Sequence, residues 1–197
     1  MDFLIATEDA VSESVLVRLV EGVGRGFNVH TRLGGRGFGY LRQKMEAFNS
    51  IASYMPVIVL TDLDTSRTVY DLRKKWLPKN KSENLIFRIA VREIESWILA
   101  DSESFSEFLG VSKAVIPRAP DELANPKDKL LELVKKSSKR SLKEEMLPAK
   151  NSSSPIGLGY NVNLCSYVEG DWSFERACER SPSLARAKKC LSGFVFK

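Results

Sequence analysis

Short apolar runs alternate with stretches of helical periodicity through the first hundred residues. Apolar runs at 3–6, 57–61 and 85–91 predict strands, and an alternating apolar and polar stretch at 27–33 predicts another. Helical patterns lie between them and after the last, at about 12–22, 40–52, 65–76 and 94–99. Four strands separated by helices indicate βαβ units, and so a mostly parallel sheet with right-handed crossovers and helices on its faces. The predicted class is α/β, of the Rossmann-like kind.

Helix starts can also be predicted, from residues that accept hydrogen bonds from the first turn. Ser12 or Ser14 is expected to cap the first helix, and Thr65 or Ser66 the third.

The second half of the chain has no strand-helix repeat. Helical patterns occupy 104–109 and 126–136, and one or two helices are expected over 171–193, with Pro182 opening the second. Residues 137–155 are rich in lysine and serine, so we expect them to be mobile or ordered by a partner. We therefore divide the chain into an α/β domain at 1–101 and a helical, loop-rich extension at 102–197 packed on it.

The histidine and cysteine content limits the kinds of catalytic and metal site that the chain can form. His30 is the single histidine, and Cys165, Cys178 and Cys190 lie far apart, which disfavours a structural zinc site and a disulfide framework. Catalysis would then rest on carboxylates, basic residues and a hard metal. There is no basic leader and no run near the roughly 20 apolar residues that span a bilayer, so we expect a cytoplasmic protein without membrane contact.

Acidic residues follow three of the four predicted strands. They are Glu8 and Asp9 after the first, Asp62 and Asp64 after the third, and Glu93 and Glu95 after the fourth. Ligands of open parallel sheets bind beyond the carboxyl ends of the strands. Asp62 and Asp64 would point to one side in extended backbone, where they could hold one hard cation or bridge two. Mg²⁺ or Mn²⁺ suits such oxygen ligands, whereas a plain helix cap is the alternative reading.

The fourth strand leaves two candidates for the site. If both Glu93 and Glu95 are helical, they diverge by about 200° around the axis, so one of them faces the site easily. The pattern does not choose between them, and a salt bridge with Arg88 or Arg92 is the alternative for either.

Basic residues gather in two stretches, 18–44 and 135–143. The candidates for nucleic-acid contact are Arg36, Lys44, Lys135, Lys136, Lys139 and Arg140. Such clusters suit a phosphate backbone, and a solvated basic face is the equal alternative. The glycine-rich stretch 34–39 matches neither a phosphate-binding loop nor a dinucleotide fingerprint, so it is either a tight turn or a close approach to phosphate near Arg36 and Lys44.

Together these features resemble the TOPRIM domain of topoisomerases, primases and OLD-family nucleases. The resemblance covers about residues 1–100 and is nearest to small stand-alone TOPRIM-like proteins of unknown function found in bacteria and their mobile elements. The residues that carry it are Ala6-Thr7-Glu8, Gly34-Gly35, Thr61 to Asp64 and Val91 to Asp101, with Gly157 to Asn161 and Ser181 to Ala187 in the extension.

The resemblance implies roles for particular residues. Glu8 matches the glutamate that takes part in metal binding and acid/base work, and Asp62 and Asp64 match the paired metal-binding aspartates. Glu93 or Glu95 matches an acid that supplements the site in nuclease members. Asp9 departs from the family, because many members have glycine there, and its side chain could crowd a phosphate or add a ligand.

The leading functional hypothesis is a Mg²⁺- or Mn²⁺-dependent nuclease or related phosphoryl-transfer enzyme. Because related nucleases often work beside an ATPase and this chain has no such phosphate-binding motif, we expect a separate ATPase partner, in a bacterial defence system. The rival is a non-catalytic module that binds nucleic acid or protein and keeps the acidic site. A phosphatase acting on small nucleotides is a third reading, and a homodimer stays open.

Overall fold

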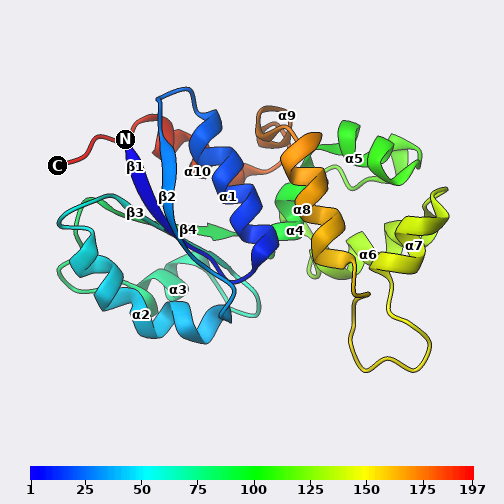
Figure 1. Ribbon diagram of the computed structural model, residues 1–197, viewed down its shortest axis with the longest axis horizontal. Coiled ribbons are helices and arrows are strands. Elements are labelled where there is room, and N and C mark those ends of the chain that lie inside the picture. Colours follow the sequence, from blue (N-terminus) through cyan, green and yellow to red (C-terminus); the bar gives the residue numbers. More distant parts are fainter.

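A parallel four-stranded sheet forms the centre of the protein, which is described here over residues 1–197 by a computed structural model (Figure 1). Its order is β2-β1-β3-β4, and all three strand pairs are parallel. The strands are β1 (Asp2–Ala6), β2 (Asn28–Leu33), β3 (Val57–Asp62) and β4 (Leu85–Ala90). The predicted α/β class and parallel sheet are confirmed, because each apolar run forms a strand.

Helices of the first half lie on both faces of this sheet. They are α1 (Ala10–Gly22), α2 (Gly37–Ile51), α3 (Val69–Trp76) and α4 (Ile94–Ala100). Figure 1 shows α1 on one side and α2 with α3 on the other. Two predicted caps were wrong. Asp9 caps α1 by accepting from Ser12 N at 2.8 Å, and Thr68 caps α3 by accepting from Asp71 N at 3.0 Å. Both capping residues have extended backbone, as a cap requires.

Helices and 3₁₀ turns are the regular elements of the second half, and loops join them. Its elements are α5 (Ser102–Leu109), the 3₁₀ turns η1 (Lys113–Val115) and η2 (Pro120–Glu122), α6 (Pro126–Lys136), α7 (Arg140–Met146), α8 (Tyr160–Gly170), α9 (Phe174–Cys178) and α10 (Pro182–Ser192). Pro182 opens α10 as predicted. Residues 137–155 are not uniformly irregular, because α7 lies within them and buries Leu142 and Met146. No helix is long and apolar enough to cross a membrane.

Two hydrophobic cores fill the two faces of the sheet. Val57 and Val59 point to the face covered by α2 and α3, whereas Ile58 and Leu60 point to the opposite face. Because both faces are covered, β3 reads as one continuous apolar run. The core that contains Ile58 and Leu60 continues from the sheet through α1 and α4 into α8 and α10. Residues 102–197 therefore share a core with the α/β half.

We predict that this shared core makes the sheet dependent on the C-terminal helices. Leu164 of α8 is fully buried in the core that includes α1, so Leu164→Ala is expected to lower the free energy of unfolding by about 2–5 kcal/mol. Val162, on the same helix, is 70% exposed, so Val162→Ala is the matched control and is expected to change it by about 0.5 kcal/mol or less. Urea unfolding followed by circular dichroism checks both. Equal effects of the two variants would contradict the shared core.

Candidate functional site

The sheet order brings the ends of β1 and β3 together. The chain leaves β1 toward β2 on one side of the sheet, while β3 leads to β4 on the other side. Such a switch point opens a crevice beyond the carboxyl ends of the two strands, where ligands of doubly wound sheets bind. Glu8 follows β1 by two residues and Asp62 is the last residue of β3, so two predicted site residues lie at this switch point.

Glu8 is held against β3 by hydrogen bonds. Its Oε1 accepts from the Thr61 hydroxyl and from the backbone N–H of Asp62, the latter at 3.0 Å. Burial raises the pKa of Glu8, and these two hydrogen bonds oppose the rise. The backbone carbonyl of Glu8 accepts from Gly37 N at 3.0 Å, which ties the glycine-rich turn to the same point.

Asp62 is the residue whose charge the protein compensates least. Its Oδ1 is buried and has no hydrogen-bond partner. Burial raises the pKa of Asp62 well above its ordinary value, and repulsion from Glu95 and then Glu8 adds to the rise. A buried carboxylate without a donor is costly, and a bound cation is one way to lower that cost. The orphaned oxygen therefore fits a cation-binding role.

Asp64 does not continue the extended backbone that the sequence analysis assumed. It has a φ of 46°, in the left-handed region that Asp tolerates better than most residues. Its backbone N–H donates to the Arg92 carbonyl at 3.0 Å, so the chain turns after β3. Asp64 thus does not repeat the direction of Asp62, and instead lines a pocket of about 310 Å³ together with Arg92 and Glu93.

Only one of the two glutamates of the fourth strand end is helical, because α4 begins at Ile94. Glu93 is the N-cap, with extended backbone, and its Oε2 accepts from Lys127 N at 2.8 Å. Glu95 lies in the first turn and is 4% exposed. Its Oε1 accepts from the Tyr160 hydroxyl at 2.8 Å and lies 3.7 Å from Lys127 Nζ. Of the two, Glu95 is the one whose repulsion raises the pKa of Asp62.

Lys127 and Tyr160 are site residues that the sequence analysis missed. The Lys127 ammonium lies 5.3 Å from the centre of the Tyr160 ring and opposes the rise in the pKa of both Asp64 and Glu95. Tyr160 had a signal in the glycines before it. A Cβ on Gly157 would lie 2.2 Å from the Glu145 carbonyl oxygen, so this position requires glycine to bring the start of α8 against α7. No sequence signal marks Lys127, because a single lysine in a polar stretch does not stand out.

The carboxylates do not converge on one point in this structure. No group of three or more His, Cys, Asp or Glu side chains is placed to hold a metal ion. Protein donors hold Glu8 and Glu95, whereas Asp62 keeps its unpartnered oxygen. In chemistry the donor set still suits a hard cation such as Mg²⁺ or Mn²⁺, because every candidate ligand is a carboxylate oxygen.

The predicted nucleic-acid contacts lie in three places. Arg36 precedes α2 beside the turn tied to Glu8, and its guanidinium lies 5.1 Å over the Tyr40 ring. Lys44 is exposed further along α2. Of the other four, Lys135 and Lys136 end α6, about 12–14 Å along that helix from Lys127, and Lys139 and Arg140 start α7. Lys136 and Arg140 are each paired at 2.7 Å, with Glu132 and Glu144.

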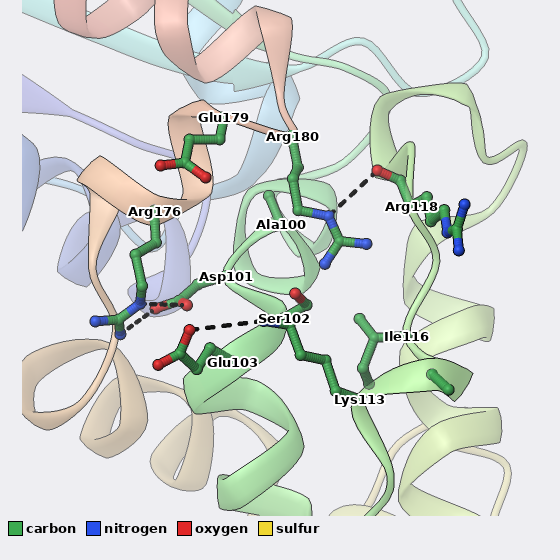
Figure 2. Close-up of a pocket in the computed structure, with 11 residues that line it drawn as sticks. Ala100, Asp101, Ser102, Glu103, Lys113, Ile116, Arg118, Arg176, Glu179 and Arg180 are labelled. Atoms are coloured by element: carbon green, nitrogen blue, oxygen red, sulfur yellow. Dashed lines mark hydrogen bonds and ion pairs between the residues drawn. The ribbon is translucent and has the colours of Figure 1, made fainter.

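A larger pocket, of about 630 Å³, lies away from these acids (Figure 2). Figure 2 shows Arg176 turned toward Asp101, and Arg176 Nε and Nη2 each donate to that carboxylate at 2.8 Å. Burial would raise the pKa of Asp101, but hydrogen bonds from Arg176, Ser104 and the Ser173 backbone outweigh it, so the pKa is lowered. Asp101 is thus a compensated, structural carboxylate.

The fold and site define an α/β protein with a doubly wound parallel sheet and an acidic crevice at its switch point. Residues 6–163 match the model of a domain of unknown function, DUF4276, and the chain belongs to this family. The matched segment contains every acid of the crevice together with Lys127 and Tyr160. No curated protein and no solved structure matches the chain.

We predict that Asp62→Asn stabilises the protein. The substitution removes a buried charge that lacks a donor, so the free energy of unfolding should rise by about 1–3 kcal/mol, with a gain in Tm of about 2–4 °C per kcal/mol. Because the folded-state pKa of Asp62 is raised above 3.8, wild type loses stability as the pH rises from about 4 through that folded-state pKa. The gap in Tm between variant and wild type should therefore widen from pH 4 to pH 7 in metal-free buffer. A lower Tm for the variant would show that Asp62 has a structural role.

Asp101→Asn is predicted to have the opposite effect. It removes charge-assisted hydrogen bonds to a fully buried side chain, so stability should fall by roughly 1.5–3 kcal/mol. The folded-state pKa of Asp101 is lowered, so its contribution is present above the unfolded value of 3.8 and is lost as the pH falls through the folded-state pKa. Thermal unfolding at pH 7 and pH 3 checks this, and a destabilisation of equal size at both values would contradict it.

Proposed function

We propose that this protein is a metal-dependent nuclease or related phosphoryl-transfer enzyme acting on nucleic acid. The observation that carries the proposal is the buried, unpartnered oxygen of Asp62 at the switch point of the sheet, with Glu8, Asp64 and Glu95 around it. The TOPRIM-like order of these acids along the chain supports the same activity. The separate ATPase partner and the role in bacterial defence belong to this proposal as well.

Asp62, Glu8 and Asp64 are the residues that would hold a Mg²⁺ or Mn²⁺ ion, with Glu95 behind them. When bound, such an ion supplies Lewis-acid polarisation of a phosphoryl oxygen and lowers the pKa of a coordinated water. The one histidine, His30, is an exposed residue of β2, so no imidazole lies at this site to activate a water.

Lys127 has the position of a phosphate-binding cation. Its Nζ is oriented by Glu95 and by the face of Tyr160, and its backbone N–H is fixed to Glu93. An ammonium held beside carboxylates is close enough to attract a phosphate while the acids bind a cation.

The glycine-rich turn offers a second approach for phosphate. Gly35 and Gly37 have φ values of 76° and 72°, and nothing lies within 4 Å of where their Cβ atoms would be. Open backbone of this kind beside Glu8 lets a phosphate come close to N–H groups, with Arg36 between the two glycines.

A non-catalytic binding module is the second candidate, and specific contacts favour it. Protein donors already hold one oxygen each of Glu8 and Glu95, and Asp9 Oδ1 is engaged as the cap of α1. Such a module would keep the acids for folding or for a partner. It predicts binding of nucleic acid without cleavage.

The proposal predicts cleavage of nucleic acid that requires Mn²⁺ or Mg²⁺ and Asp62. Purified protein is incubated with labelled single-stranded DNA, double-stranded DNA and RNA, with each metal or with EDTA. Asp62→Asn and Glu8→Gln should each lower the rate at least about 100-fold, because each removes a group that stabilises charge in the transition state. Lys127→Ala should also reduce the rate.

Asp128→Asn is the matched control for this assay. It makes the same chemical change at an exposed carboxylate next to Lys127, and the rate should stay within about twofold of wild type. Cleavage that is equal in wild type and Asp62→Asn would identify a contaminant and overturn the enzyme proposal. Absence of cleavage on all three substrates would favour the binding module.

A further inference from the structure

Three arginines from separate elements surround a small pocket at the edge of the sheet. Arg73 lies on α3, Arg88 on β4 and Arg186 on α10, and all three line a pocket of about 200 Å³. The other lining residues are Val69, Ile89, Val91 and Ser183, so the lining contains no acidic residue. Because β4 is an edge strand, this pocket lies where the two helical layers meet beside an open strand.

None of these arginines is paired with a carboxylate. Every ion pair of the protein is formed by residues other than these three arginines. Arg73 and Arg88 donate to backbone carbonyls instead. Arg88 Nε donates to its neighbour Phe87 O at 2.9 Å and its Nη1 to Arg186 O at 3.4 Å, while Arg73 Nη1 donates to Phe87 O at 3.3 Å. A guanidinium has five N–H donors, so most of the donors in this cluster remain free.

The cluster carries three positive charges in a partly desolvated place. Burial lowers the pKa of Arg88, attraction to Cys190 opposes that fall, and repulsion from Arg73 and then Arg186 adds to it. Buried charges are ordinarily paired, and here the pairing group is missing from the chain itself.

The arginine pocket adjoins the acidic crevice. Val91 lines the pocket, and the next residue, Arg92, lines the one that contains Asp64 and Glu93. In the β3–β4 ladder Asp62 pairs with Ala90, two residues beyond Arg88, which is about 7 Å along the strand. A phosphate held by the arginines would therefore lie a short distance from the acids.

We propose that Arg73, Arg88 and Arg186 bind a backbone phosphate of the nucleic-acid strand whose adjoining segment enters the acidic crevice. The inference rests on the proposed function and names the path of its substrate, which runs along the β4 edge. It differs from the paths expected from the sequence, because none of the three arginines belongs to the basic stretches 18–44 or 135–143. Guanidinium groups suit a phosphate because their donors match its oxygens in pairs.

The test measures binding of a fluorescein-labelled single-stranded DNA 20-mer by fluorescence anisotropy in EDTA. The variant is Arg73→Gln/Arg186→Gln, which leaves the more buried Arg88 in place. At 100 mM NaCl its Kd should be about tenfold weaker than that of wild type. The slope of log K against log salt should fall by about 0.7, the contribution of one phosphate contact on a single strand. Unchanged circular dichroism and Tm would show that the variant is folded.

The matched control is Lys74→Gln/Lys189→Gln, which removes two exposed charges from the same two helices. Its Kd should change less than threefold. Equal weakening in both double variants would attribute binding to general charge and overturn the proposal, as would no weakening in either. A third arm uses inorganic phosphate as competitor. If phosphate displaces the 20-mer at an affinity equal to that of the strand itself, the pocket is a site for free phosphate.

These outcomes are separate from those of the cleavage assay. Binding in EDTA does not depend on a metal, and Asp62→Asn, which should abolish cleavage, should bind the 20-mer at least as tightly as wild type because it removes a negative charge. If Asp62→Asn abolishes cleavage but the arginine variant binds the 20-mer as wild type does, the nuclease proposal stands and the proposed path along β4 is refuted. Binding lost in the arginine variant, in a protein that cleaves nothing, keeps the path and refutes the nuclease.

Discussion

The carboxylate of Asp62 is enclosed where β1 and β3 end, and no donor of the protein reaches its buried oxygen. The other acids of the crevice are arranged around this point by elements far apart in the chain. The end of β3 holds Glu8, and Tyr160 of α8 with Lys127 of α6 holds Glu95. The helical second half thus completes the crevice as well as the core, because it supplies the donors that the sheet lacks.

Two buried carboxylates of this protein show opposite electrostatics. Asp101 is fully enclosed, yet Arg176, Ser104 and the Ser173 backbone compensate its charge, and its pKa falls. Asp62 is less enclosed as a residue, but its Oδ1 is buried and meets only like charges, and its pKa rises. Asp101 shows that this fold can supply donors to a buried carboxylate, so the lack of donors at Asp62 is specific to that position. Leaving Asp62 unsatisfied costs stability, which is typical of groups retained for binding or catalysis.

The sheet and the position of the acids could be predicted because both follow from local periodicity. Apolar runs buried on both faces define the strands, and parallel strands place their following residues at one edge. What was missed has a local cause in two cases and a tertiary cause in the third. Asp9 caps α1 in place of the expected serines because it comes directly before the first turn, and α8 was overlooked because its sequence has no clear apolar stripe. Lys127 reaches the crevice only through the packing of α6 on α4, which no local pattern reports.

Acidic and basic side chains lie close together in this protein, and both affect how a polyanion binds. Glu8, Asp62, Asp64 and Glu95 repel a phosphate, whereas Arg73, Arg88 and Arg186 attract one nearby. Nucleic acid held by the arginines would therefore approach the acids against repulsion. A cation among the carboxylates reduces that repulsion, and thermodynamic linkage then requires that the strand strengthen cation binding by the same factor. An acidic crevice beside an arginine pocket thus favours the assembly of strand and cation together over either alone.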